Sequence, residues 1–143
     1  MGATAGAAAE QSLATRLGFK PGQVVQEFGY DDDVDQDLRD SIEDVTGEEI
    51  LDEDADDIVD VVLLWWREED GDLVDGLVDV HASVAASSVV WVLTPKSGRP
   101  GHVEASDIQE AAGTAGLHST SSMSVGKDWT GTRLVQPGGR KGY

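Results

Sequence analysis

Two short runs of apolar residues, 61–66 and 89–93, form the clearest pattern in this chain of 143 residues. Neither run alternates polar with apolar positions, so each predicts a strand that is buried on both faces. Such strands occur in parallel sheets that helices cover on both sides. Between the two runs, residues 72–86 have helical spacing, and Asp72 is a favourable N-cap for that helix. A strand, a helix and a second strand in this order predict the crossover unit of an open α/β sheet.

Weaker patterns on either side extend the same sheet. A strand predicted over 23–30 is followed by a helix whose apolar stripe begins at Val34 and which ends at Gly47. Three further strands and one further helix are predicted near 48–51, 119–125, 132–136 and 104–115. The last two strands are joined by a short link that contains Asp128 to Gly131, which favours an antiparallel pair.

The expected fold is a single three-layer Rossmann-like α/β domain over residues 12–136, with a small, mostly parallel sheet and one antiparallel strand near the edge. Counted along the chain, the expected strand order across the sheet is second, first, third, fourth, sixth, fifth. The Ala/Gly-rich residues 1–11 are expected to form a disordered tail, and residues 137–143 a flexible basic tail. No apolar run approaches the roughly 20 residues that span a bilayer, so no membrane partner is expected.

Charge is distributed very unevenly along the chain. The formal net charge is −18, and residues 31–79 alone hold 22 acidic and two basic residues. This segment would repel a phosphate backbone, which argues against nucleic acid as a partner. Two interpretations stay open: a solubilising surface, or an electrostatic docking face for a basic protein partner. The chain holds no Cys, which excludes disulfides and thiolate metal sites and suits a cytoplasmic protein.

Residues 25–33 span the junction between the strand predicted over 23–30 and the helix that follows it, which is where a Rossmann-like fold carries its ligand loop. This segment resembles the first motif of S-adenosylmethionine-dependent methyltransferases, in which an acidic residue and a glycine precede further alternating glycines. Glu27 and Gly29 match that motif, but Asp31 and Asp33 stand at the later glycine positions. Aspartate adds bulk and charge where the backbone has to approach a cofactor closely. We therefore expect no cofactor and no useful affinity for S-adenosylmethionine.

The acidic and titratable residues do not predict a metal site or a catalytic centre. Asp33, Asp35 and Asp37 begin like a calcium-binding EF-hand loop, but Leu38 stands where that loop requires glycine. The three histidines are too widely spaced for a zinc-ligand pattern. No serine-nucleophile motif is present. The sequence therefore assigns no catalytic residue and no metal ligand.

A ligand site, if present, is expected in the crevice at the carboxyl ends of the strands. Its weak candidates for cofactor binding are Gly29, Trp66, Lys96 and Trp129. Lys96 would supply a positive charge to an anionic group, and its alternative role is that of a solvated loop residue. Trp129, in the link between the last two strands, is expected either to cap the edge of the core or to contact a ligand.

Three segments resemble a bacterial family of about this length that is known as a domain of unknown function. They are residues 13–22, residues 90–96 with the pattern Trp-x-x-x-Pro-Lys, and residues 128–135 with Trp129-Thr130-Gly131. The resemblance implies a pared-down methyltransferase-type sheet and does not imply a mechanism. The sequence thus favours a non-catalytic cytoplasmic binding or regulatory module that acts through its acidic face or a Trp-lined crevice. The alternative is a methyltransferase that uses S-adenosylmethionine, and the oligomeric state stays open.

Overall fold

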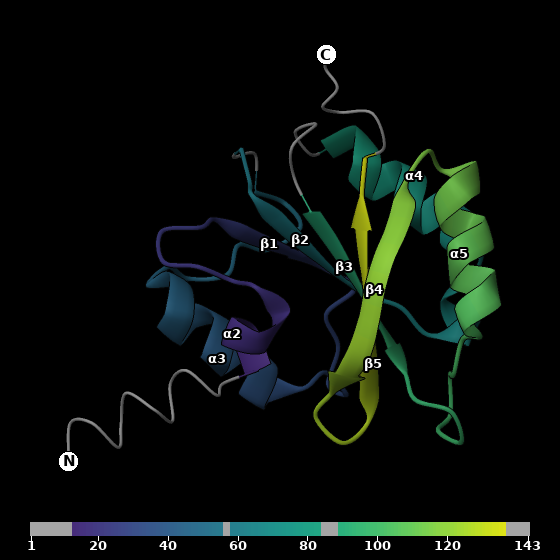
Figure 1. Cartoon of the computed structure of the whole chain (residues 1–143), viewed down its shortest axis with the longest axis horizontal. Coiled ribbons are helices and arrows are strands. Elements are labelled where there is room, and N and C mark those ends of the chain that lie inside the picture. Colours follow the sequence, from purple (N-terminus) through teal and green to yellow (C-terminus); the bar gives the residue numbers. More distant parts are fainter. Residues whose placement is uncertain (1–12, 56–57, 84–88, 137–143) are drawn as a thin grey trace.

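A mixed sheet of five strands forms the framework of the molecule, and helices pack along both of its sides (Figure 1). The computed structural model describes residues 13–55, 58–83 and 89–136. Along the chain its elements are α2 (Leu13–Leu17), β1 (Val25–Phe28), α3 (Gln36–Thr46), β2 (Val61–Trp65), the short 3-10 helix η1 (Glu68–Asp70), α4 (Leu73–Ser83), β3 (Val89–Pro95), α5 (Ala105–Thr114), β4 (His118–Val125) and β5 (Trp129–Val135).

The strands lie in the order β1-β2-β3-β5-β4. β1 pairs with β2 and β2 pairs with β3 in parallel, whereas β5 is antiparallel to both β3 and β4. On the outer side of β1, Leu51 forms an isolated parallel bridge to Gln26. The predicted strand order is therefore confirmed, but the strand predicted over 48–51 is reduced to that single bridge.

Burial of β2 and β3 on both faces explains their continuous apolar sequences. Along β2, Val61, Leu63 and Trp65 pack into one apolar cluster with residues of α2 and α3. Val62 and Leu64 point to the opposite face and pack with residues of α4 and α5. All five β2 side chains are at most 4% exposed. The two clusters agree with the placement of α2 and α3 on one side of the sheet and α4 and α5 on the other (Figure 1).

The ends of two helices follow the expected local chemistry. The side chain of Asp35 accepts a hydrogen bond from the backbone N of Leu38 at 2.9 Å and so caps the start of α3. Gly47 ends the same helix with a left-handed φ of 76°. At α4, the Oδ1 atom of Asp72 accepts from the backbone N of Val74 at 2.9 Å, as the sequence predicts.

One prediction about the last strands is wrong. Residues 129–131 do not form a link, because β5 begins at Trp129, whose backbone pairs with Pro95 of β3. Burial of the Trp129 ring, which is 3% exposed, extends the strand to this position. The predicted tails, 1–11 and 137–143, and the last residues of the predicted helix 72–86 lie outside the described residues. Within the described ranges, no helix is long and apolar enough to cross a bilayer.

Candidate functional site

The carboxyl ends of the parallel strands meet at one edge of the sheet, which is where open α/β sheets bind ligands. Gly29 follows β1, Arg67 follows β2 and Lys96 follows β3 at this edge. Because β5 is antiparallel, it begins here, and Trp129 joins the same group of residues. We call this region the strand-end edge, and it is the candidate functional site.

Arg67 lies at the centre of the strand-end edge, and only 7% of its side chain is exposed. Its Nη1 atom donates to the carbonyl of Gly29 at 2.8 Å and, more weakly, to that of Trp65 at 3.4 Å. Its Nε atom donates to Oδ2 of Asp33 at 3.1 Å, and its Nη2 atom donates to Oδ1 of the same carboxylate. The Asp70 carboxylate accepts from the backbone N of Arg67 at 2.9 Å. A single guanidinium therefore joins the loop after β1 to the end of β2.

An aromatic ring lies against this guanidinium. The Cζ atom of Arg67 is 5.4 Å from the ring centroid of Trp129, within the range of a cation–π interaction. Nε1 of Trp129 donates to the backbone carbonyl of Asp33 at 3.2 Å. On its inner side, Trp129 packs edge-on against Trp65 with centroids 4.8 Å apart. The ring thus connects the ion pair at the edge to the core.

Glu27, the acidic residue of the loop motif, is 5% exposed and has internal partners. Its Oε2 atom accepts from Nε1 of Trp65 and from Nε of Arg39, each at 2.8 Å. Its Oε1 atom accepts from Nη2 of Arg39 at 3.1 Å. Arg39 also lies over the ring of Tyr30, with 4.9 Å between its Cζ atom and the ring centroid. The Glu27 carboxylate therefore serves to hold α3 and β2 against β1.

The ion pairs at this edge change the acidity of their members. The hydrogen bond from Arg67 holds the pKa of Asp33 below its ordinary value of 3.8. Burial disfavours the charged form of Arg67, but the hydrogen bond and charge of Asp33 outweigh it, so the pKa of Arg67 is raised. Burial is likewise the largest single influence on Arg39 and lowers its pKa, but the hydrogen bond and charge of Glu27, together with the charges of Tyr30 and Glu43, raise the pKa overall. Both arginines and Asp33 are therefore charged at neutral pH.

Gly29 has a structural reason to be glycine. Its φ is +78°, and a Cβ atom at this position would lie 2.3 Å from the carbonyl oxygen of Trp65. No side chain fits between the loop after β1 and the end of β2. The glycine of the motif is thus required by the close approach of two backbone segments.

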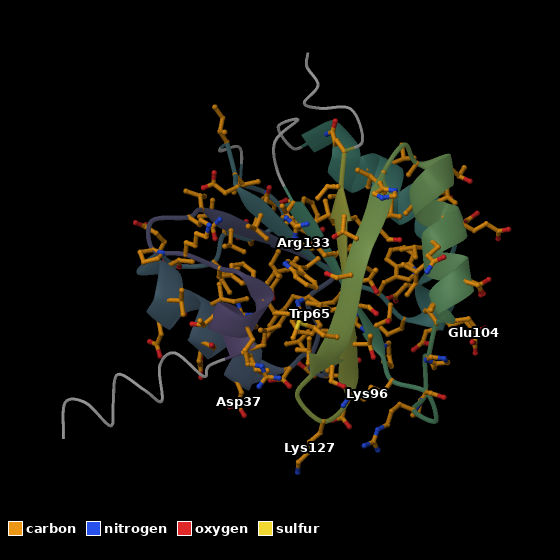
Figure 2. The ribbon with its side chains drawn as sticks, viewed as in Figure 1. Asp37, Trp65, Lys96, Glu104, Lys127 and Arg133 are labelled. Carbon is orange, nitrogen blue, oxygen red and sulfur yellow. The ribbon has the colours of Figure 1, made fainter. Side chains whose placement is uncertain are left out.

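The structure brings together some of the predicted site residues and separates one of them. Gly29 and Trp129 both contact Arg67. The Nζ atom of Lys96 donates to the carbonyl of Gly126 at 2.9 Å, so this side chain binds the β4–β5 turn (Figure 2). Trp66 lies on the other face of the sheet, packed against the cluster of α4 and α5.

Sequence reasoning missed Arg67 and treated Asp33 only as a residue that replaces glycine. A signal for Arg67 exists, because residues 31–79 hold only two basic residues, and one of them directly follows the buried central strand. A base in that position, among many acids, indicates an internal ion pair. Which acid it meets cannot be read from the spacing.

Outside the Trp129 ring, a cavity of about 350 Å³ is lined by Asp33, Pro95, Arg99, Pro100, Asp128 and Trp129. Arg99 and Asp128 form an ion pair there at 3.1 Å, but both side chains are more than half exposed. In the parts of the chain that the structure describes, no three His, Cys, Asp or Glu side chains gather to hold a metal ion. The strand-end edge is therefore an ion-pair network with a shallow hollow beside it.

Sheet order and strand directions define the class of fold, which is that of the Rossmann-like methyltransferases. The pyocyanin biosynthetic protein PhzM is similar with a TM-score of 0.66 at 13% identity, over 90% of this chain and 53% of PhzM. The mitomycin 7-O-methyltransferase MmcR is similar with a TM-score of 0.57 at 14% identity, over 80% of this chain and 49% of MmcR. A methyltransferase from Aquifex aeolicus gives a TM-score of 0.57 at 14% identity, over 85% and 86% of the two chains. The chain thus spans about half the length of PhzM and MmcR.

The sequence relatives identify the family. Residues 14–138 match the model of a family described as "Protein of unknown function (DUF3052)", and the chain belongs to this family. Uncharacterized proteins of Mycobacterium tuberculosis and Mycobacterium bovis are 53% identical to it over 131 residues, which is 92% of this chain and 82% of each relative. Both parts of the predicted resemblance, to a bacterial family of unknown function and to a methyltransferase-type fold, are confirmed.

Proposed function

We propose that this protein is a non-catalytic cytoplasmic binding module. In this proposal it is a single three-layer Rossmann-like domain in which its own side chains fill the strand-end edge, where a methyltransferase would bind its cofactor. The observation that carries this proposal is the buried guanidinium of Arg67, bound to Gly29 and Asp33 in the loop after β1. The fold of a methyltransferase is kept, but the atoms that would face a cofactor have internal partners.

The residues of this loop do not fit S-adenosylmethionine, the cofactor named for several similar structures. Arg67 engages both the carbonyl of Gly29 and the carboxylate of Asp33. A ligand that entered the loop would have to separate this largely buried cation from its partners and so remove the hydrogen bonds that compensate for its burial. The Glu27 carboxylate already accepts hydrogen bonds from Arg39 and Trp65, so it would also have to lose internal partners to bind a ligand.

The acidic segment supports a basic protein as the partner. Its two basic residues, Arg39 and Arg67, each form an internal ion pair. These two cations are engaged with Glu27 and Asp33, so most of the acids of residues 31–79 that the structure describes have no cation of that segment beside them. An approaching basic surface would meet negative charge on both sides of the sheet, since α3 and α4 lie on opposite sides and both carry these acids, and such charge favours rapid association.

Calorimetry with S-adenosylmethionine and S-adenosylhomocysteine tests the proposal. We expect no binding heat from the native protein at ligand concentrations up to about the millimolar range. The alternative function, methyl transfer from S-adenosylmethionine, is favoured by Glu27 and Gly29 and requires such binding. A dissociation constant in the low micromolar range would overturn the proposal in favour of this alternative.

A matched variant tests whether Arg67 is the group that prevents S-adenosylmethionine from binding at the strand-end edge. Asp33→Gly restores one glycine of the motif, but it leaves the carbonyl of Gly29 bound to Arg67. We expect this variant to remain without affinity for S-adenosylmethionine. If Asp33→Gly alone restored tight binding, Arg67 would not be the group that fills the edge.

A further inference from the structure

A groove of about 460 Å³ lies between α4 and α5, on the face of the sheet opposite α2 and α3. Its floor includes the partly buried apolar side chains Trp66, Val74 and Val103. Its volume falls within the range of sites that hold small ligands or the side chains of a partner. The groove shares no lining residue with the hollow beside Trp129.

Four carboxylates and no basic side chain line this groove. They belong to Glu68, Asp72, Asp107 and Glu110. Asp72 is used to cap α4, but the carboxylates of the other three form no hydrogen bond or ion pair with any residue that the structure describes. All four side chains are exposed. An apolar floor with acidic walls is complementary to a ligand that carries both apolar groups and positive charge.

The tryptophan in this groove, Trp66, requires a glycine inside the neighbouring helix α4. Trp65, Trp91 and Trp129 are at most 3% exposed, whereas Trp66 is only partly buried. A Cβ atom on Gly76 of α4 would lie 2.6 Å from Cζ3 of Trp66. Glycine inside a helix is less stable than alanine. Because Gly76 has no side chain, the Trp66 ring can pack against α4, and part of this ring lines the groove.

We propose that the groove between α4 and α5 binds a basic segment of a partner protein, in which lysine or arginine residues flank an apolar side chain. The apolar side chain would lie on Trp66, and the cations would pair with Glu68, Asp107 and Glu110. This inference rests on the proposed function and names the surface through which a basic partner docks. It assigns the docking of a basic partner to one defined groove of the acidic surface.

A synthetic peptide and two variants of equal charge test the groove. The probe is the blocked, fluorescein-labelled peptide Lys-Leu-Arg-Leu-Lys, and its binding is measured by fluorescence anisotropy at physiological salt. Glu68→Gln/Asp107→Asn/Glu110→Gln removes the free groove carboxylates. The control Asp44→Asn/Glu48→Gln/Glu49→Gln removes three exposed carboxylates at the end of α3, on the other side of the sheet.

We expect the groove variant to bind the peptide about tenfold more weakly, because three exposed ion pairs are lost together and each contributes only modestly. The control should lose less than about twofold, because it changes only the long-range field. Equal losses in the two variants would mean that the peptide senses net charge alone, and this would overturn the proposal. Absence of binding to the native protein would overturn it as well.

The fluorescence of Trp66 provides a second, independent measurement of peptide binding in the groove. Peptide binding should change the tryptophan emission of the native protein, and Trp66→Leu should abolish that change while the protein stays folded by circular dichroism. A Lys-Ser-Arg-Ser-Lys peptide should bind more weakly than the leucine peptide. If the peptide does not behave in these ways and the protein also has no affinity for S-adenosylmethionine, only the proposal about the groove is refuted. Tight binding of S-adenosylmethionine would refute the proposed function whatever the peptide does.

Discussion

Replacing Arg67 with methionine removes the cation from the strand-end edge and keeps an apolar stem of similar length. The change eliminates the hydrogen bond to the carbonyl of Gly29 and the paired bonds to Asp33. Breaking a buried ion pair costs about 3–5 kcal/mol, and a hydrogen bond to a charged group about 1.5–3 kcal/mol. The Asp33 side chain is 54% exposed and regains water, which reduces the loss. We therefore expect the free energy of unfolding to fall by about 3 kcal/mol, which lowers Tm by about 10 °C.

Urea unfolding followed by circular dichroism measures this loss, and Arg99→Met is the matched control. Arg99 also forms an ion pair with an aspartate, Asp128, at 3.1 Å, but the two side chains are 52% and 59% exposed. The control should change the free energy of unfolding by less than about 0.5 kcal/mol. A loss below about 1 kcal/mol in Arg67→Met would refute the idea that Arg67 holds this edge together.

Acid should remove part of the difference between the native protein and Arg67→Met. Arg67 lowers the pKa of Asp33 below 3.8 in the folded state, so the ionised carboxylate stabilises the fold at higher pH. This contribution is fully present above the ordinary pKa and is lost as pH falls through the lowered value. The free-energy difference between the two proteins should be constant from about pH 5 to 8 and should shrink below about pH 4. A difference that stays constant in acid would show that the ion pair with Asp33 adds no stability.

Two further substitutions test the packing around Arg67. Gly29→Ala should destabilise the protein by more than about 2 kcal/mol, because its Cβ would lie 2.3 Å from the carbonyl oxygen of Trp65. Gly18→Ala, also at positive φ but with open space, should cost only about 1–2 kcal/mol, and equal losses in thermal unfolding would argue against the close approach. Glu27→Gln should cost about 2 kcal/mol in urea unfolding, because its amide NH₂ would face a donor of Arg39 or Trp65. A loss below about 0.5 kcal/mol would mean that the charge of Glu27 is dispensable.

Part of the candidate site could be predicted, because strand ends in a parallel sheet share one edge. Gly29 lies near the end of the strand predicted over 23–30 and Lys96 follows the run 89–93; in the structure both residues follow strands, β1 and β3, at that edge. Trp66 also follows a strand, yet it lies on the opposite face, since alternate residues of a strand point to opposite sides. Trp129 is predicted in a link, but it begins β5, although Thr130 and Gly131 carry no apolar pattern that marks a strand. Of the edge strand predicted over 48–51, only Leu51 pairs with β1.

The sequence by itself determined the sheet, the order of its strands and the absence of an intact glycine motif after β1. These properties depend on neighbouring residues, because burial on both faces requires consecutive apolar side chains and a turn requires local glycines. Only the tertiary structure decided that Arg67 pairs with Asp33 and lies over Trp129. Those three residues are far apart along the chain, and many carboxylates were equally available to one guanidinium. Their pairing follows from where β1, β2 and β5 begin and end in the sheet. The number of residues between them along the chain does not predict how close they lie in space.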